Sequence, residues 1–119
     1  MSITLFGIAN CDKVKAARRF LDERGHPYQF VDLRQQGIDP QLLARACSQL
    51  GLGKVLNKSS ATFRQLSPEQ QQQASSLEGA LPLMLAHPTL IKRPLLSAGS
   101  HLLCGFDTTA YQYLLTELA

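Results

Sequence analysis

Apolar and polar positions follow one another along the chain in a pattern that predicts alternating strands and helices. The run Ile3–Phe6 is rich in strand-forming residues and ends at Gly7, so it predicts a short buried strand. From Asp12 onward, apolar residues recur at helical spacing as far as Gly25, where a glycine is typical of a helix C-terminus. Tyr28–Leu33 again has strand composition. A strand, a helix and a second strand with short connections are most often a right-handed parallel crossover.

The middle of the chain is predicted to be helical. Asp39-Pro40 offers a capping carboxylate followed by a proline at the first helical position, and an apolar stripe continues from there to Gly51. Ser67–Gln70 has the pattern of a capping box, and Glu78–His87 predicts one more short helix. We therefore expect a helical insertion at about residues 39–88.

The C-terminal part predicts a hairpin and a last helix. Leu95–Ala98 and His101–Cys104 are apolar runs separated only by Gly99-Ser100, which indicates two antiparallel strands. Asp107 or Thr108 is expected to cap an amphipathic helix that follows. The element order predicts an α/β fold, a four-stranded mixed sheet with the helical insertion.

Length and composition limit the classes of protein to consider. With 119 residues, of which 45% are hydrophobic and 18% charged, we expect residues 1–119 to form a single globular domain. No apolar run approaches the roughly 20 residues of a membrane span, and the N-terminus lacks the pattern of a secretion signal. A net charge of +3 is too small to indicate nucleic-acid binding by itself. The expected location is the cytoplasm, with neither a membrane nor a nucleic acid as partner.

The three cysteines are odd in number and widely spaced, which makes a poor disulfide framework and fits a reducing compartment. No Cys-x-x-Cys pair exists and the histidines occur singly, so we expect no metal site. Cys47 falls on an apolar helical stripe and Cys104 in a predicted buried strand. Both are interpreted as small core residues.

Cys11 lies where the predicted first loop meets the first helix. The unpaired N–H groups and the positive end of a helix stabilise a thiolate there, and Lys13 and Lys15 follow within one turn. Asp12 opposes thiolate formation unless its carboxylate caps the helix. Position alone leaves two interpretations open, a reactive thiol and a buried structural one.

Several motifs, in their order along the chain, resemble the ArsC family. They are Asn10-Cys11 after the first strand, Asn57–Arg64 in the middle, Leu90–Leu96, and Cys104–Phe106. The resemblance covers nearly the whole chain and is strongest to the YffB-like branch, related to the arsenate reductases and the Spx regulators. It implies a thioredoxin-like fold, Cys11 as the redox-active thiol, and a cis peptide bond before Pro94.

The same resemblance implies an anion-binding set. Arg93 corresponds to an arginine that lines the oxyanion site of the family, and Lys58 stands where arsenate reductases have another arginine. Phe106 falls about where a third arginine is expected, so arsenate should bind more weakly than in a true arsenate reductase. The candidate anion- or glutathione-binding residues are Asn10, Lys13, Lys58, Arg64, Arg93 and Pro94.

The favoured hypothesis is a thiol-disulfide oxidoreductase that uses Cys11 as its single nucleophile and acts on a small oxidised substrate. Val14 stands where many Spx regulators have a second cysteine, so glutathione or a glutaredoxin must resolve the mixed disulfide. Glutathione would then be a co-substrate, and no tightly bound cofactor is expected. The alternatives are an arsenate reductase, a non-catalytic Spx-like regulator that binds RNA polymerase, and a domain with an inert cysteine.

Overall fold

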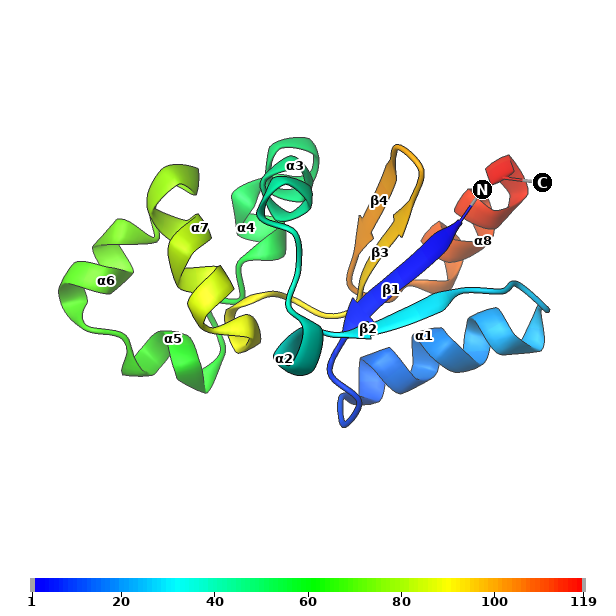
Figure 1. Ribbon diagram of the computed structural model, residues 1–119, viewed down its shortest axis with the longest axis horizontal. Coiled ribbons are helices and arrows are strands. Elements are labelled where there is room, and N and C mark those ends of the chain that lie inside the picture. The colour runs from blue at the N-terminus through cyan, green and yellow to red at the C-terminus, as the bar shows by residue number, and fades with distance from the viewer. Residues whose placement is uncertain (1, 119) are drawn as a thin grey trace. The chain divides into compact units, whose positions relative to one another are not determined.

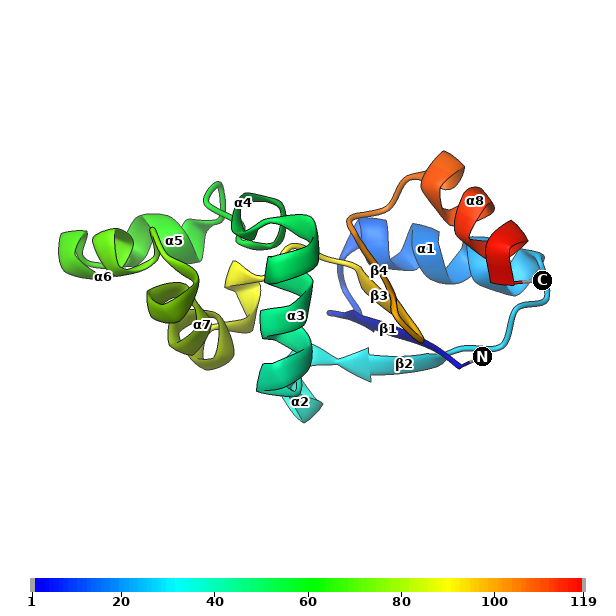
Figure 2. The same cartoon turned by 90° about the horizontal axis from the view of Figure 1, so that it is seen from above.

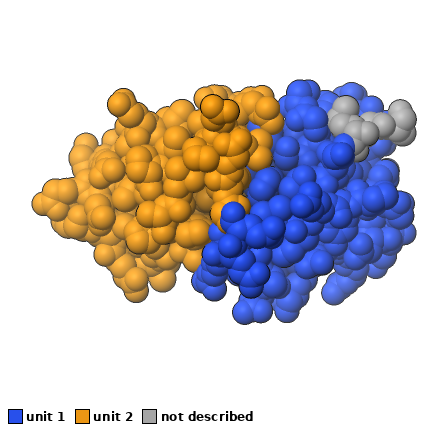
Figure 3. Space-filling model, viewed as in Figure 1, with its two compact units in different colours: residues 1–36, 93–119 blue, residues 37–92 orange. Residues whose placement is uncertain are grey.

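The computed structural model describes residues 2–118, and the chain forms two compact units (Figure 3). Unit 1 joins the two ends of the chain, residues 1–36 and 93–119, and unit 2 is the continuous segment 37–92. The predicted insertion, 39–88, falls within unit 2, and that both units make one domain stays a prediction. Among the residues described, no helix is both long and apolar enough to cross a membrane.

Unit 1 holds all four strands of the sheet (Figure 1). Its elements are β1 (Ile3–Gly7), α1 (Asp12–Glu23), β2 (Gln29–Asp32), α2 (Leu33–Gln36), β3 (Leu95–Ala98), β4 (His101–Cys104) and α8 (Thr108–Leu118). The strand order is β2-β1-β3-β4, with β1 and β2 parallel and the other pairs antiparallel. This confirms the predicted mixed four-stranded sheet and its thioredoxin-like topology.

One face of the sheet is covered by α1 and α8, which lie on the same side of it (Figure 2). Every second strand residue points its side chain toward this face. These side chains pack against the apolar stripes of both helices. The buried cluster comprises Ile3, Leu5, Ala17, Phe20, Leu21, Leu96, Ala98, Tyr111, Leu114 and Leu115. The cluster fixes the sheet register, because a slip by one residue would turn these side chains to the other face.

The structure corrects the second predicted strand. β2 spans only Gln29–Asp32, and Leu33 begins the short helix α2. The carboxylate oxygen Oδ1 of Asp32 accepts hydrogen bonds from the backbone N–H groups of Arg34, at 2.8 Å, and Gln35, at 3.2 Å. These bonds turn the chain out of the strand, which the apolar pattern up to Leu33 does not reveal.

Unit 2 is helical, as predicted, but has more short elements than the sequence indicates. They are α3 (Pro40–Leu50), α4 (Leu52–Val55), α5 (Ala61–Gln65), α6 (Pro68–Gln73), α7 (Leu77–Ala86) and the 3-10 helix η1 (Pro88–Leu90). Asp39 caps α3 and Ser67 forms a capping box with Gln70 at α6, so both predicted helix starts are confirmed. The missed elements, α4, α5 and η1, have three to five residues each, too few to show helical periodicity.

The two cysteines interpreted as core residues differ in their surroundings. Cys47 on α3 is 4% exposed, and burial raises the pKa of its thiol. Cys104 is only half-buried, so the prediction of a core position is wrong for it. The reason is that β4 is an edge strand of the sheet, with a neighbouring strand on one side alone.

Candidate functional site

Cys11 is the N-cap residue of α1, at the junction that the sequence predicts. Its backbone is extended, with φ −83° and ψ 128°, and its side chain makes no capping hydrogen bond. The Cys11 N–H donates to the carbonyl of Ile8 at 3.0 Å, and the Cys11 carbonyl accepts from the N–H of Lys15 at 3.0 Å. Both backbone groups are therefore occupied, and the half-buried sulfur is left at the helix start.

The end of β1 is held very close to the first turn of α1. A methyl group on Gly7 would lie 2.6 Å from Cγ2 of Val14, which is fully buried. Only a residue without a side chain fits at this distance. Cys11 lies between Gly7 and Val14 in the sequence. The close contact of Gly7 with Val14 therefore restricts where Cys11 can lie relative to the sheet.

The charged neighbours of Cys11 on α1 act in opposite directions. Asp12 is the first residue of the helix rather than its cap, so its negative charge stays beside the sulfur. Lys13 and Lys15 are exposed on the same helix and supply compensating positive charge. Asn10, just before the cysteine, is also exposed.

β3 starts at the end of the sheet where β1 ends and the loop to Cys11 begins. Phe6 pairs with Leu95, so the next residues outward, Gly7 and Pro94, are also neighbours at this end. The Arg93–Pro94 peptide bond is cis, as the family resemblance implies, and the Pro94 carbonyl accepts from the Gly105 N–H at 2.8 Å. Arg93 is half-buried, and its Nε atom is buried. Asn10, Cys11 and Lys13 thus follow the end of β1 at the same end of the sheet where Arg93 and Pro94 precede β3.

Two candidate residues, Lys58 and Arg64, lie in unit 2. Lys58 is exposed in the loop before α5. Arg64 is on α5, and its Nη1 donates to the carbonyl of Ser59 at 2.8 Å. Ser60 caps the helix by accepting from the Phe63 N–H at 3.1 Å. The Arg64 guanidinium is therefore part of the structure of this loop, and the roles of both cations at a site remain predictions.

A polar pocket of about 240 Å³ lies beside the loop that leads to Cys11, within unit 1. Its lining residues are Ile8, Ala9, Asn10, Asp32, Arg34 and Gln35. The pairing of Gly7 with Asp32 explains this arrangement, because it places the end of β2 beside the loop that leads to Cys11. Asp32 and Arg34 are absent from the sequence prediction.

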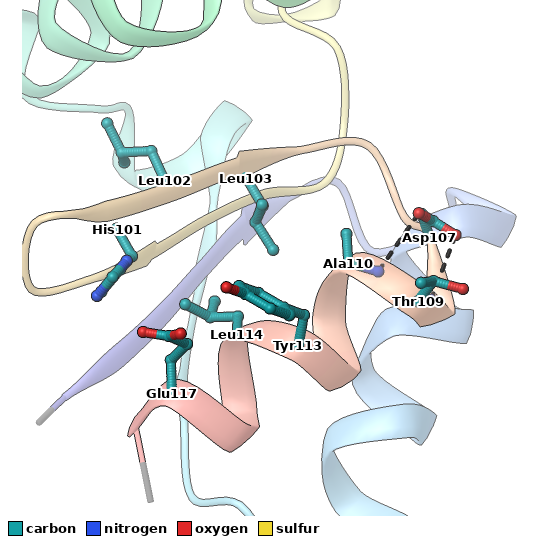
Figure 4. A pocket seen from close by; sticks show the side chains of 9 residues that line it. All are labelled: His101, Leu102, Leu103, Asp107, Thr109, Ala110, Tyr113, Leu114 and Glu117. Atoms are coloured by element: carbon teal, nitrogen blue, oxygen red, sulfur yellow. Dashed lines mark hydrogen bonds between the residues drawn. The ribbon is translucent and has the colours of Figure 1, made fainter.

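A larger groove of about 570 Å³ lies away from Cys11, between the edge strand β4 and α8 (Figure 4). Leu103, Ala110 and Leu114 give it an apolar floor, and Tyr113 is 69% exposed beside it. Its Asp107 accepts hydrogen bonds from the N–H groups that begin α8. Its lining residues all lie between His101 and Glu117, and none belongs to the loop or the helix start that holds Cys11.

No ligand-like cluster of histidine, cysteine, aspartate or glutamate exists in the part of the chain that the structure describes. The candidate site has a thiol at a helix start, with Lys13 and Lys15 on the same helix and a polar pocket beside the loop before it. A thiolate in such surroundings is a nucleophile toward disulfides and other oxidised sulfur.

Comparison with known proteins gives a family and several relatives. The profile of the ArsC family matches residues 6–114. An uncharacterised protein of Haemophilus influenzae is 37% identical over 110 residues, which are 92% of this chain and 96% of that protein. A solved YffB protein is 41% identical, with a TM-score of 0.89 and coverage of 94% of this chain and 97% of that one. An arsenate reductase (ArsC) related protein from Brucella melitensis is 34% identical, with a TM-score of 0.70 and coverage of 97% and 95%.

Proposed function

The chain belongs to the ArsC family, and from this premise we propose that it is a thiol-disulfide oxidoreductase with Cys11 as its only nucleophile. The observation that carries the proposal is the position of Cys11. Its sulfur lies at the start of α1, makes no capping bond, and shares a sheet edge with the cis Arg93–Pro94 peptide. Of the other two cysteines, Cys47 is buried on α3 and Cys104 is half-buried on β4.

The proposed reaction is the removal of glutathione from a mixed disulfide. The Cys11 thiolate attacks the glutathionyl sulfur, a Cys11–glutathione disulfide forms, and the substrate leaves as a thiolate that takes up a proton. The thiolate of a second glutathione, or of a glutaredoxin, then attacks the same glutathionyl sulfur. Glutathione disulfide, or a glutathionylated glutaredoxin, is released, and Cys11 returns to its thiolate form. Over one cycle the substrate sulfur is reduced from a disulfide to a thiol, the sulfur of one external thiol is oxidised to a disulfide, and Cys11 is regenerated.

A glutathione partner suits the charges near the thiol. Glutathione carries a net negative charge at neutral pH, and Lys13, Lys15 and Arg93 lie at the edge that holds Cys11. Lys58 and Arg64, the other two predicted cations, lie in unit 2, and their roles stay predictions. The external thiol takes the place of a local resolving cysteine, since position 14 is a buried valine packed against Gly7.

The test compares two matched variants, Cys11→Ser and Cys47→Ser. Each is incubated with glutathione disulfide, and the adduct is measured by intact-protein mass spectrometry. We expect Cys11→Ser to lose the adduct and keep its folding free energy, because the half-buried sulfur contributes little packing. Cys47→Ser should keep the adduct and lose about 1–3 kcal/mol of stability, because a buried hydroxyl lacks a partner there. Full adduct formation by Cys11→Ser would refute the proposed nucleophile.

Arsenate reduction is the second candidate, favoured by the relative from Brucella melitensis that is described as related to an arsenate reductase. At position 106, however, the structure has an apolar contact instead of a cation. The Phe106 ring packs edge-on against Tyr111 and Phe20, with centroid distances of 4.9 and 5.7 Å. A coupled assay with arsenate, glutathione and glutaredoxin separates the two functions, and we expect turnover of glutathionylated substrates without turnover of arsenate.

A further inference from the structure

The polar pocket beside Cys11 is connected to the thiol through the backbone. Ile8, Ala9 and Asn10 form one wall, and the same residues form the turn that the Cys11 N–H closes on the Ile8 carbonyl at 3.0 Å. A turn of this kind keeps its first and fourth Cα atoms within about 7 Å. The Cα atom of Cys11 therefore lies within about 7 Å of the Cα atom of Ile8 in the pocket wall, so a molecule joined to Cys11 through a disulfide can extend toward this pocket.

Asp32 forms the second wall and is held rigidly. Its Oδ1 accepts from the N–H groups of Arg34 and Gln35, while its own N–H donates to Oε1 of Gln36 at 3.1 Å. Oδ2 accepts no hydrogen bond from the residues that the structure describes. One carboxylate oxygen is thus fixed for the fold, and the second is available to a ligand.

Arg34 supplies the opposite charge in the same pocket. Its side chain is exposed, and its guanidinium makes no hydrogen bond or ion pair with other residues described in the structure, Asp32 included. A cation and an anion that line one pocket without pairing suit a ligand that carries both charges. A simple oxyanion such as arsenate would gain the attraction of Arg34 and meet the repulsion of Asp32.

We propose that this pocket binds an α-amino-acid head group, with the carboxylate of the ligand on Arg34 and its ammonium on Oδ2 of Asp32. The proposal rests on the proposed function of Cys11, and it names the substrate class as disulfides that carry such a group. Two sources have this chemistry: the γ-glutamyl end of glutathione, several bonds from the sulfur, and cystine, where the group is adjacent to the sulfur. The volume of about 240 Å³ suits a head group rather than a whole peptide.

The test measures the rate of mixed-disulfide formation on Cys11 at pH 7 with five disulfides. Glutathione disulfide and cystine carry the full head group, dithiodipropionate carries only carboxylates, cystamine only ammonium groups, and bis(2-hydroxyethyl) disulfide no charge. The variants are Arg34→Gln and Asp32→Asn, where asparagine retains the Oδ1 acceptor that turns the chain. Arg19→Gln, an equal charge change at an exposed position about 12 Å further along α1, is the matched control.

We expect Arg34→Gln to slow the reaction with glutathione disulfide and with dithiodipropionate about five- to tenfold, since the contact is charge-assisted but solvent-exposed. Asp32→Asn should slow the reaction with glutathione disulfide and with cystamine by a similar factor. The only ammonium group of glutathione is on its γ-glutamyl residue, so this effect reports that end of the molecule. The same losses with cystine, and not with glutathione disulfide, would assign the pocket to the amino-acid group next to the sulfur.

The uncharged disulfide should react equally with every variant. The proposal is overturned if Arg34→Gln and Asp32→Asn leave the charged disulfides unaffected, or change them no more than Arg19→Gln does. That result would leave the reactivity of Cys11 intact, and with it the proposed function. If unmodified Cys11 reacts with none of the five disulfides, the proposed function itself fails.

Discussion

The close approach of β1 to α1 can be tested by adding one methyl group, in Gly7→Ala. The new Cβ would lie 2.6 Å from Cγ2 of Val14, shorter than real Cβ contacts, and 3.0 Å from Cγ1, tighter than most of them. Val14 has little freedom to move away, because a β-branched side chain in a helix has one strongly preferred rotamer. The helix start, and Cys11 with it, must therefore shift relative to the sheet.

The magnitude follows from two contributions. Overpacking a core contact costs about 1–3 kcal/mol. Replacing the glycine lowers the conformational entropy of the unfolded chain, which offsets about 0.4–1 kcal/mol of this cost. We therefore expect Gly7→Ala to lower the free energy of unfolding by about 1–2 kcal/mol. Val14→Ala, which empties a fully buried position, should cost about 2 kcal/mol by itself.

The double variant Gly7→Ala/Val14→Ala distinguishes a steric conflict from two independent losses. The methyl group at position 7 then fills part of the space that Val14 vacates, so the double variant should be about as stable as Val14→Ala alone. Urea denaturation measures the three free energies, and the alkylation rate of Cys11 should fall in Gly7→Ala and recover in the double variant. If the two free-energy losses add to within about 0.5 kcal/mol, the contact between these residues is not what places the cysteine.

Variants at three further residues test other parts of unit 1 and unit 2. Cys47 should be alkylated far more slowly than Cys11 in the folded protein, and its raised pKa should make stability fall as the pH rises above about 8.5, an effect that Cys47→Ala removes. The pKa of Tyr111 is raised by burial and by the nearby Cys104, and its buried hydroxyl finds no hydrogen-bond partner in the described chain. Tyr111→Phe should therefore stabilise the protein by about 1 kcal/mol and weaken its loss of stability above about pH 10, whereas a destabilised variant would contradict the unpaired hydroxyl. Asp107→Ala should cost about 0.5–2 kcal/mol in urea denaturation by uncapping α8, and Asp107→Asn should retain most of that stability.

The sequence predicts the elements whose signals are local. The cap at Asp39, the capping box at Ser67 and the hairpin turn at Gly99-Ser100 each lie within a few residues of the element that they define. The position of Cys11 at a helix start is predictable for the same reason. Each of these signals depends on hydrogen bonds and backbone conformations within a few neighbouring residues.

The polar pocket has no such local signal. Asp32 ends a segment of strand composition, and Arg34 lies in a helix of four residues, too short to show a period. Only the register that pairs Gly7 with Asp32 brings these two charges beside Asn10. The edge position of β4, which leaves Cys104 half-buried, likewise depends on the order of strands in the completed sheet.

The central pairing of the sheet has a consequence for synthesis of the protein. β3, the partner of β1 on one side, follows the whole of unit 2 in the chain. At about 5–20 residues per second, translation takes roughly 3–11 s to pass through that segment. During that time the side of β1 that pairs with β3 has no partner strand, and unit 2 can fold from contacts within its own continuous segment. Nascent chains stalled before β3 should therefore show protease protection in residues 37–92 while residues 1–36 remain susceptible.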